Sequence, residues 1–219
     1  MIVLGLTGSI GMGKTAAARS FTALGIPVFE ADAVVHELLG PGGAAVAAVG
    51  GVFPAALVDD HVDRALLGAL VFKDPNALRC LEAILHPLVR ARERKFLRAA
   101  AASGAWVAVL DIPLLFEAGA AARCDYVAVV SAPAGTQRAR VLRRPAMTES
   151  RYRAVLAQQM SDRAKRRRAD FVIDTGAGRR RTLQRIRAII RMLRVAGHSG
   201  RRRWGRVRRL DGSQCAKSS

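Results

Sequence analysis

The chain has 219 residues, 51% of them hydrophobic and 24% charged, which fits one domain, with or without an inserted subdomain, and excludes a disordered chain. Its net charge of +19 is confined to the end: residues 1–135 carry 11 basic and 12 acidic side chains, residues 136–196 carry 18 and 4, and residues 197–219 carry 7 and 1. This distribution excludes a uniformly basic protein. The total charge does not choose among three roles of a basic segment: binding nucleic acid, clamping a polyanionic small substrate, or forming a solvated face with no partner.

Short apolar runs alternate with helical stretches along the chain. In order, we predict a strand at 2–7, a helix at 14–24, a strand at 27–29, a helix at 33–39, a helix at 76–102, a strand at 106–110, a strand at 126–130, helices at 134–143 and 148–168, a strand at 171–173 and a helix at 179–195. Gly25 occupies the position of a helix C-cap glycine. The alternation predicts an α/β fold with a central parallel five-stranded sheet flanked by helices.

Two segments depart from this alternation. More residues separate the second and third predicted strands than one crossover helix needs, so we expect a helical insertion at about 40–104, although the Gly- and Ala-rich residues 40–51 show no clear pattern. From Gly197 the apolar periodicity ends, which predicts a basic, disordered tail at 197–219.

A phosphate-binding loop follows the first strand and opens the first helix. Its eight residues match GxxxxGK[ST]: Gly8, Ser9, Ile10, Gly11, Met12, Gly13, Lys14 and Thr15. Glycines at these positions let backbone N–H groups surround phosphate oxygens. We expect Lys14 to reach the β- and γ-phosphates of ATP and the Thr15 hydroxyl to bind Mg²⁺.

Acidic residues follow the second and third predicted strands, at the edge where open α/β sheets bind ligands. Asp32 is either a general base for an attacking hydroxyl or the N-cap of the helix at 33–39. Glu30 is either structural or an outer contact of Mg²⁺. Asp111 is a candidate contact of Mg²⁺ through water.

A basic helix follows the fourth strand. Arg140 and Arg144 are four residues apart and therefore share a helix face, with Gln137 one turn earlier. Arginines on one face, followed by the break at Pro145, indicate a lid that closes on phosphates, the alternative being a solvated basic face. His86 lies next to Pro87 within the expected insertion. A lone histidine is more often a structural hydrogen-bonding residue than an acid or a ligand-binding residue.

The cysteines and the N-terminus bear on location. Cys80, Cys124 and Cys215 are far apart without a CxxC pair, which argues against disulfides and structural zinc and favours a reducing compartment. No basic residue precedes Lys14, and no apolar run reaches about 18 residues, so we expect neither a signal peptide nor a membrane span. The sequence predicts a soluble cytoplasmic protein.

Taken together, these segments resemble the dephospho-coenzyme A kinase family, P-loop kinases related to the nucleoside monophosphate kinases. The matching segments are GLTGSIGMGKT (5–15), LGIPVFEADAVVHELL (24–39), VDRALLGALVF (62–72), LEAILHPLV (81–89), DIPLLFE (111–117), the helix with Gln137, Arg140 and Arg144, LAQQM (156–160) and ADFVID (169–174). They occur in the family's order and extend to about residue 195. The phosphate-binding loop alone would not single out this family, whereas the segments with Asp32, His86 and DIPLLFE do.

The resemblance implies a P-loop kinase fold at 1–196 with an acceptor-binding helical insertion and a helical lid at about 138–168. It implies transfer of the γ-phosphoryl group of ATP to the 3′-hydroxyl of dephospho-CoA, with Mg²⁺ as cofactor. Asp32 becomes the general base, Lys14 and Arg140 act in catalysis, and Arg140 and Arg144 contact ATP. The acceptor-binding residues carried over are Asp32, Arg64, His86, Pro87 and Leu114.

Two positions depart from the family pattern. Glu30-Ala31-Asp32 stands where Asp-Ala-Asp is usual, and Asp174-Thr175-Gly176 stands where an Asn-rich stretch near the adenine is common. The alternatives are another P-loop kinase for a small molecule or a nucleoside monophosphate, and a nucleic-acid-binding role of the basic end. The tail has only one aromatic residue, Trp204, so we expect no specific binding of nucleic acid. We also expect no membrane association and a monomer.

Overall fold

The computed structural model describes residues 1–72 and 74–198, with side chains up to Ala196. The last helix, α9 (Arg179–His198), extends two residues into the predicted tail. Residues 199–219, the rest of that tail, lie outside the described residues. None of the helices within the described ranges is long and apolar enough to cross a membrane.

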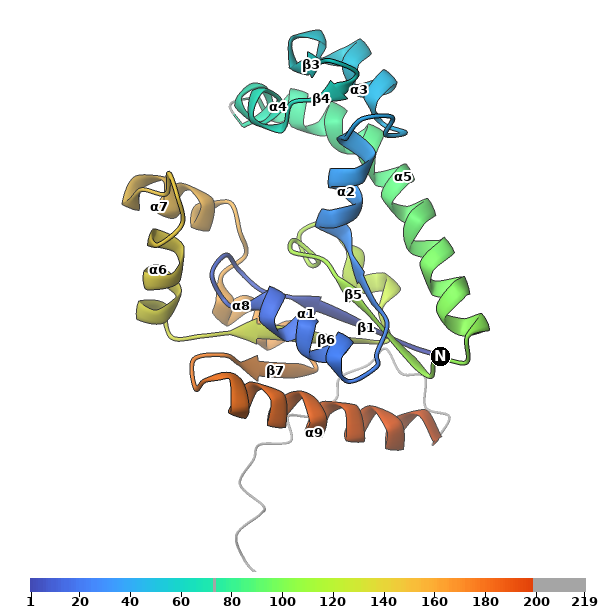
Figure 1. The fold of residues 1–219 in the computed structure, drawn as a ribbon. Helices are drawn as coiled ribbons and strands as arrows, with labels where there is room; N and C mark the ends of the chain where they lie inside the picture. Colours follow the sequence, from blue (N-terminus) through green and yellow to red (C-terminus); the bar gives the residue numbers. More distant parts are fainter. Residues whose placement is uncertain (73, 199–219) are drawn as a thin grey trace, which may run out of the picture.

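Five parallel strands form the central sheet, as the sequence predicts (Figure 1). They are β1 (Ile2–Thr7), β2 (Val28–Glu30), β5 (Val107–Asp111), β6 (Tyr126–Ser131) and β7 (Phe171–Asp174). Their spatial order is β2-β5-β1-β6-β7, so the N-terminal strand is central. Because all five run in the same direction, the loops that follow β1, β2, β5 and β6 emerge at one edge of the sheet.

Helices cover both faces of the sheet. On one face α1 (Lys14–Ala23) and α9 pack through Phe21 and Ile186 against Leu4 and Leu6 of β1. Gly25 ends α1 with φ +75°, which confirms its capping position. On the other face, alternate residues of the same strands contact α5 (Pro75–Ala102) and the short 3₁₀ helix η2 (Ala120–Arg123).

The chain between β2 and β5 rises away from the sheet and has a core of its own (Figure 1). It contains α2 (Ala31–Leu39), α3 (Val46–Val52), the 3₁₀ helix η1 (Pro54–Ala56), β3 (Leu57–Val58), β4 (His61–Val62), α4 (Arg64–Val71) and α5. Its ambiguous stretch, 40–51, contributes most of α3. The small antiparallel pair β3–β4 was not predicted.

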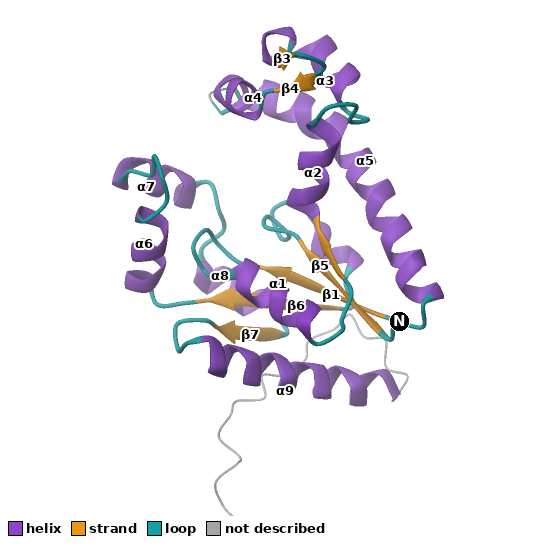
Figure 2. Cartoon of the chain, viewed as in Figure 1, coloured by secondary structure: helices purple, strands orange, loops and turns teal. Residues whose placement is uncertain are grey.

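The chain between β6 and β7 forms three helices, seen beside and above the sheet in Figure 2. They are α6 (Ala134–Leu142), α7 (Glu149–Ala157) and α8 (Asp162–Arg168). The prediction of one helix over 148–168 is therefore wrong. The chain leaves the helix at 158–161, and Ser161 starts α8 by accepting a hydrogen bond from the N–H of Ala164.

Candidate functional site

The phosphate-binding loop joins β1 to α1 at the carboxyl edge of the sheet. Gly11 and Gly13 have φ of +76° and +87°, which disfavour any residue with a Cβ. A Cβ on Gly8 would lie 2.8 Å from the carbonyl oxygen of Val130. These glycines are therefore required by backbone conformation and by contact, and the loop ends at the N-terminus of α1, where N–H groups are unpaired by the helix.

The carbonyl groups of this loop are held from outside. The oxygens of three consecutive residues, Ile10–Met12, each accept a hydrogen bond. The donors, in order, are Gln137 Nε2 at 2.8 Å, Arg140 Nη1 at 3.5 Å and Thr175 Oγ1 at 2.6 Å. Because C=O and N–H point to opposite sides of a trans peptide, the N–H groups that follow Ile10 and Met12 turn toward the inside of the loop, where an anion would bind.

Lys14, the lysine of the loop, forms an ion pair with Asp111 at the end of β5. Its Nζ lies 2.6 Å from Asp111 Oδ1, and the two side chains are 17% and 5% exposed. Burial raises the pKa of Asp111; Lys14 opposes this, while Asp32 and Glu30 add to it. The pair therefore places the lysine among carboxylates at the carboxyl edge of the sheet.

Asp32 and Glu30 lie beside that pair because β2 is hydrogen-bonded to β5, with Glu30 opposite Asp111. The N-cap of α2 is Glu30, whose side chain makes no capping hydrogen bond, and Asp32 lies in the first turn. The alternative of Asp32 as N-cap is therefore wrong. Its carboxylate is exposed at the edge of the sheet, where it can accept a proton from a ligand.

Oxygen ligands suited to Mg²⁺ gather at this edge. Thr15 follows Lys14 at the start of α1 with an exposed side chain. Asp111 ends β5, and Asp32 lies in the first turn of α2, after the neighbouring strand β2. Hard oxygen atoms of this kind fit Mg²⁺, which retains water and phosphate ligands and needs few protein ligands. Within residues 1–72 and 74–198, no cluster of three or more His, Cys, Asp or Glu residues is arranged to hold a metal ion by itself.

The two predicted lid arginines differ in position. Arg140 is half-buried and donates to the Thr175 carbonyl at 2.8 Å and to its hydroxyl at 3.0 Å, which holds the guanidinium against the loop. Arg144 is exposed and lies beyond α6, which ends at Leu142. The expectation of a shared helix face for the two is therefore wrong, because the helix ends between them.

The predicted acceptor-binding residues lie on three different segments. Arg64 begins α4, and its Nη1 lies 2.8 Å from Nδ1 of His36 on α2. His86 and Pro87 are exposed on α5, and Leu114, in the loop after β5, is 42% exposed. Within residues 1–72 and 74–198, no hydrogen bond joins His86, Pro87 or Leu114 to Arg64.

Three contacts of the site were not assigned from the sequence: Thr175 on Met12, His36 on Arg64, and Gln159, whose Oε1 accepts from the N–H of Ile10. His36 follows Asp32 by one helical turn, a spacing that could have identified it. Thr175 was noted only as a departure from the family pattern. The position of Gln159 depends on the break between α7 and α8.

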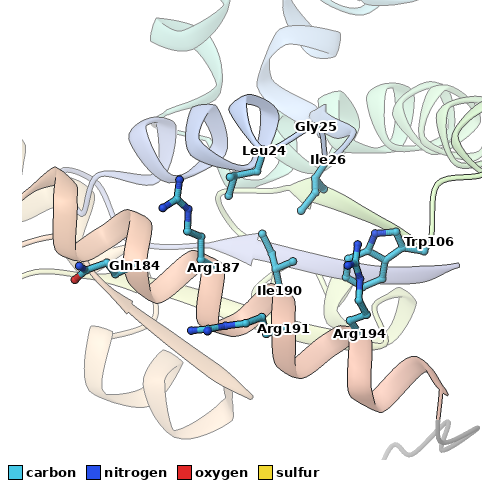
Figure 3. A pocket seen from close by; sticks show the side chains of 9 residues that line it. All are labelled: Leu24, Gly25, Ile26, Trp106, Gln184, Arg187, Ile190, Arg191 and Arg194. Atoms are coloured by element: carbon cyan, nitrogen blue, oxygen red, sulfur yellow. The ribbon is translucent and has the colours of Figure 1, made fainter.

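A separate hollow of about 460 Å³ lies at the opposite edge of the sheet, between α9 and the turn before β2 (Figure 3). Ile26, Ile190 and Trp106 give it apolar walls, and arginines of α9 surround it. The Arg194 guanidinium lies 5.0 Å from the centre of the Trp106 ring. Because Ile26 and Trp106 precede their strands, this hollow is distinct from the loop that binds phosphate.

Comparisons with known proteins agree on one family. The family model for dephospho-CoA kinase matches residues 2–180. The dephospho-CoA kinase of Mesorhizobium japonicum is 53% identical over 194 residues, covering 89% of this chain and 98% of that protein. That of Paramagnetospirillum magneticum is 58% identical over 194 residues, covering 89% and 92%.

Two solved structures share the fold. TT1252 from Thermus thermophilus superposes with a TM-score of 0.76 and 33% identity, covering 88% of this chain and 97% of that one. The dephospho-CoA kinase from Campylobacter jejuni superposes with a TM-score of 0.58 and 22% identity, covering 87% and 96%.

Proposed function

The chain belongs to the dephospho-CoA kinase family, and from that premise we propose that it transfers the γ-phosphoryl group of ATP to the 3′-hydroxyl of dephospho-CoA, giving coenzyme A and ADP. One observation carries the proposal. Lys14 of a complete phosphate-binding loop lies 2.6 Å from Asp111, with Asp32 exposed in the first turn of α2, directly after the neighbouring strand β2. A phosphate-binding group and a proton acceptor thus share one edge of the sheet.

ATP binds at the loop. The N–H groups turned inward by the outward carbonyls contact phosphate oxygens, and Lys14 exchanges its bond to Asp111 for one to the β- and γ-phosphates. Arg140, held over the loop by Thr175, adds positive charge there, and Arg144 approaches the phosphates from beyond α6. Thr15 and Asp111 would hold Mg²⁺, which neutralises the charge that develops on the phosphates.

Asp32 is the general base. The 3′-hydroxyl oxygen forms a bond to the γ-phosphorus as the bond from that phosphorus to the oxygen of ADP breaks, and the hydroxyl proton passes to the Asp32 carboxylate. The proposal rests on the exposed position of this carboxylate in the first turn of α2.

The acceptor lies against the insertion, at about 40–104. Arg64, His86, Pro87 and Leu114 bind it, with His36 holding the guanidinium of Arg64 in place. Residues 1–196 act as one kinase domain with a lid at about 138–168. We infer a cytoplasmic monomer that uses ATP, Mg²⁺ and dephospho-CoA, without a membrane or a specific nucleic acid.

A kinase assay with purified protein tests this function. Wild type should convert dephospho-CoA and ATP to coenzyme A and ADP, and Asp32→Ala should lower kcat by about 10²–10⁴ because the general base is lost. The affinity for ATP should persist, since the loop is unchanged. Glu37→Gln, an exposed acid on the same helix, is the matched control and should keep its turnover.

Other results would redirect the assignment. Phosphorylation of a nucleoside monophosphate, with dephospho-CoA ignored, would show a related kinase with another acceptor. If Arg64→Ala and His86→Ala both leave the KM for dephospho-CoA unchanged, the acceptor site is wrong while the reaction stands.

A further inference from the structure

One peptide segment of the phosphate-binding loop is held on both sides by glutamines. The carbonyl oxygen of Ile10 accepts from Gln137 Nε2 at 2.8 Å, and its N–H donates to Gln159 Oε1 at 3.1 Å. The backbone fixes which end of each side-chain amide must face it: the NH₂ group of Gln137 and the oxygen of Gln159. The two glutamines therefore have opposite hydrogen-bonding roles.

These glutamines stand at the two ends of the segment formed by α6 and α7. Gln137 lies in the first half of α6 and is 5% exposed, while Gln159 lies in the link between α7 and α8. Both ends of the α6–α7 segment are therefore hydrogen-bonded to the backbone of the same loop residue, Ile10. A displacement of either end changes a hydrogen bond to Ile10.

The link that carries Gln159 is itself fixed. The N–H of the next residue, Met160, donates to Glu117 Oε1 at 2.9 Å, and that oxygen also lies 3.0 Å from Nζ of the fully buried Lys165. Burial would raise the pKa of Glu117, but hydrogen bonds from its own N–H and from Met160, together with the ion pair with Lys165, outweigh it and lower the pKa. The link is therefore held by Glu117, which is itself ion-paired with the buried Lys165.

The other end is fixed by packing. A Cβ on Gly11 would lie 2.4 Å from Cγ2 of Val141 and 2.9 Å from the carbonyl oxygen of Gln137. Helix α6 therefore packs directly against the loop at Gly11, on the side where Gln137 donates to Ile10.

We propose that Gln137 and Gln159 are positioning residues that hold the Ile10 segment in its phosphate-binding orientation and transmit movement of the α6–α7 segment to the loop. Only the turnover part of this inference rests on the proposed function. Its central claim concerns nucleotide binding, which is measured without the acceptor.

The opposite roles give the test its contrast. Replacing glutamine by glutamate keeps an acceptor oxygen but removes the NH₂ donor. Gln159→Glu therefore preserves the bond to the Ile10 N–H, whereas Gln137→Glu places a carboxylate against the Ile10 carbonyl. Gln159→Met removes the acceptor at similar size. Gln158→Glu adds the same charge one residue away, at an exposed position without a side-chain bond to the loop in the described structure.

Calorimetric titration of each purified full-length variant with ATP gives the main readout. Gln137→Glu and Gln159→Met should weaken ATP binding about tenfold, because each leaves a backbone group of Ile10 unpaired. Gln159→Glu and Gln158→Glu should stay within about threefold of wild type, the effect of a partly solvated charge. Steady-state kinetics should show the KM for ATP rising while the KM for the acceptor stays constant.

If Gln137→Glu and Gln159→Met both bind ATP as tightly as wild type, the proposal is wrong. It is also wrong if Gln159→Glu behaves like Gln159→Met while Gln158→Glu behaves like wild type. Should Gln137→Glu fail to fold, the Gln159 pair decides. Failure of the proposed function has a different signature: wild type binds ATP but does not turn over dephospho-CoA.

Discussion

At the scale of single residues, Asp111 links the nucleotide site to the acid that lies beside it. Burial raises its pKa, Lys14 counteracts the rise, and the charges of Asp32 and Glu30 reinforce it. In the proposed ATP complex Lys14 binds a phosphate instead of Asp111, and Asp111 then loses the partner that stabilises its charge. The same phosphate therefore changes the charge balance at Asp32, which lies in the first turn of α2, just after the adjacent strand β2.

A buried thiol permits a prediction about pH. Burial, with a further contribution from Glu93, raises the pKa of Cys124 from 9.0 to about 12. At about pH 8 the thiolate that reacts with disulfide reagents is therefore nearly absent at this position. In a Cys80→Ser/Cys215→Ser variant, Cys124 should resist a disulfide reagent until denaturant is added, and its native reactivity should rise only as pH approaches 12.

The contrasting variant keeps Cys80, which is exposed, and replaces the other two cysteines. It should react rapidly without denaturant. Equal reactivity of the two variants would contradict the burial of Cys124 in the core between the sheet and helix α5.

At the scale of elements, one ion pair joins the long helix α5 to η2. Arg123 Nε and Nη2 donate to the two oxygens of Glu93 at 2.9 and 3.0 Å, and Glu93 is 3% exposed. Arg123→Ala leaves this buried carboxylate unpaired and should lower the free energy of unfolding by about 3 kcal/mol, the lower end of the range because Arg123 is partly exposed. Urea denaturation measures the loss.

Arg98, an exposed arginine on α5, provides the control. Arg98→Ala should change the free energy of unfolding by less than about 1 kcal/mol. Adding Glu93→Leu to Arg123→Ala should restore stability, because the unpaired charge is then removed. If Arg123→Ala alone is neutral, the carboxylate has another source of stabilisation.

Elements with a strong local pattern were predictable. All five strands contain short apolar runs, and the phosphate-binding loop is defined by glycines and Lys14, so the sheet and the position of the loop at its carboxyl edge were predictable. The roles of the individual site residues stay predictions. For Asp32, the sequence left a general base and a helix N-cap as alternatives, and the resemblance favoured the general base. The resemblance alone supplied the acceptor-binding roles of Arg64 and His86, whose spacing carries no comparable local signal.

Elements set by distant contacts were not predictable. No glycine or proline marks the break at 158–161. Two hydrogen bonds between residues remote in sequence stabilise it: Gln159 accepts one from the Ile10 N–H, and the Met160 N–H donates one to Glu117. Ser161 offered the one local indication, as a helix-capping residue. The pair β3–β4 turns at Asp59-Asp60, with φ of 40° and 60°, a turn more commonly built with Asn or Gly.

At the scale of the whole molecule, the charge divides the chain into parts with different roles. The residues of the candidate site all precede residue 176, whereas residues 199–219 carry 7 basic and 1 acidic side chains. Deleting 199–219 should leave kcat and KM for both substrates within about twofold and should remove any salt-dependent binding of DNA. Kinetics and a salt titration on full-length and shortened protein test this.

A large loss of turnover on deletion would show that the basic end contributes to phosphate binding. A control with Arg201, Arg202 and Arg203 changed to Gln separates the charge of that segment from its length.

The central position of β1 has a consequence for synthesis on the ribosome. Strand β1 is made before the other four strands but pairs with β5 and β6, which are completed only near residues 111 and 131, while α9, which closes one face, is made after all five strands. The core between β2 and β5 comes from nearby stretches of chain and can pack earlier. A growing chain therefore carries its nucleotide-binding loop on an unpaired apolar strand, so the protein depends most on protection from aggregation before it can bind ATP.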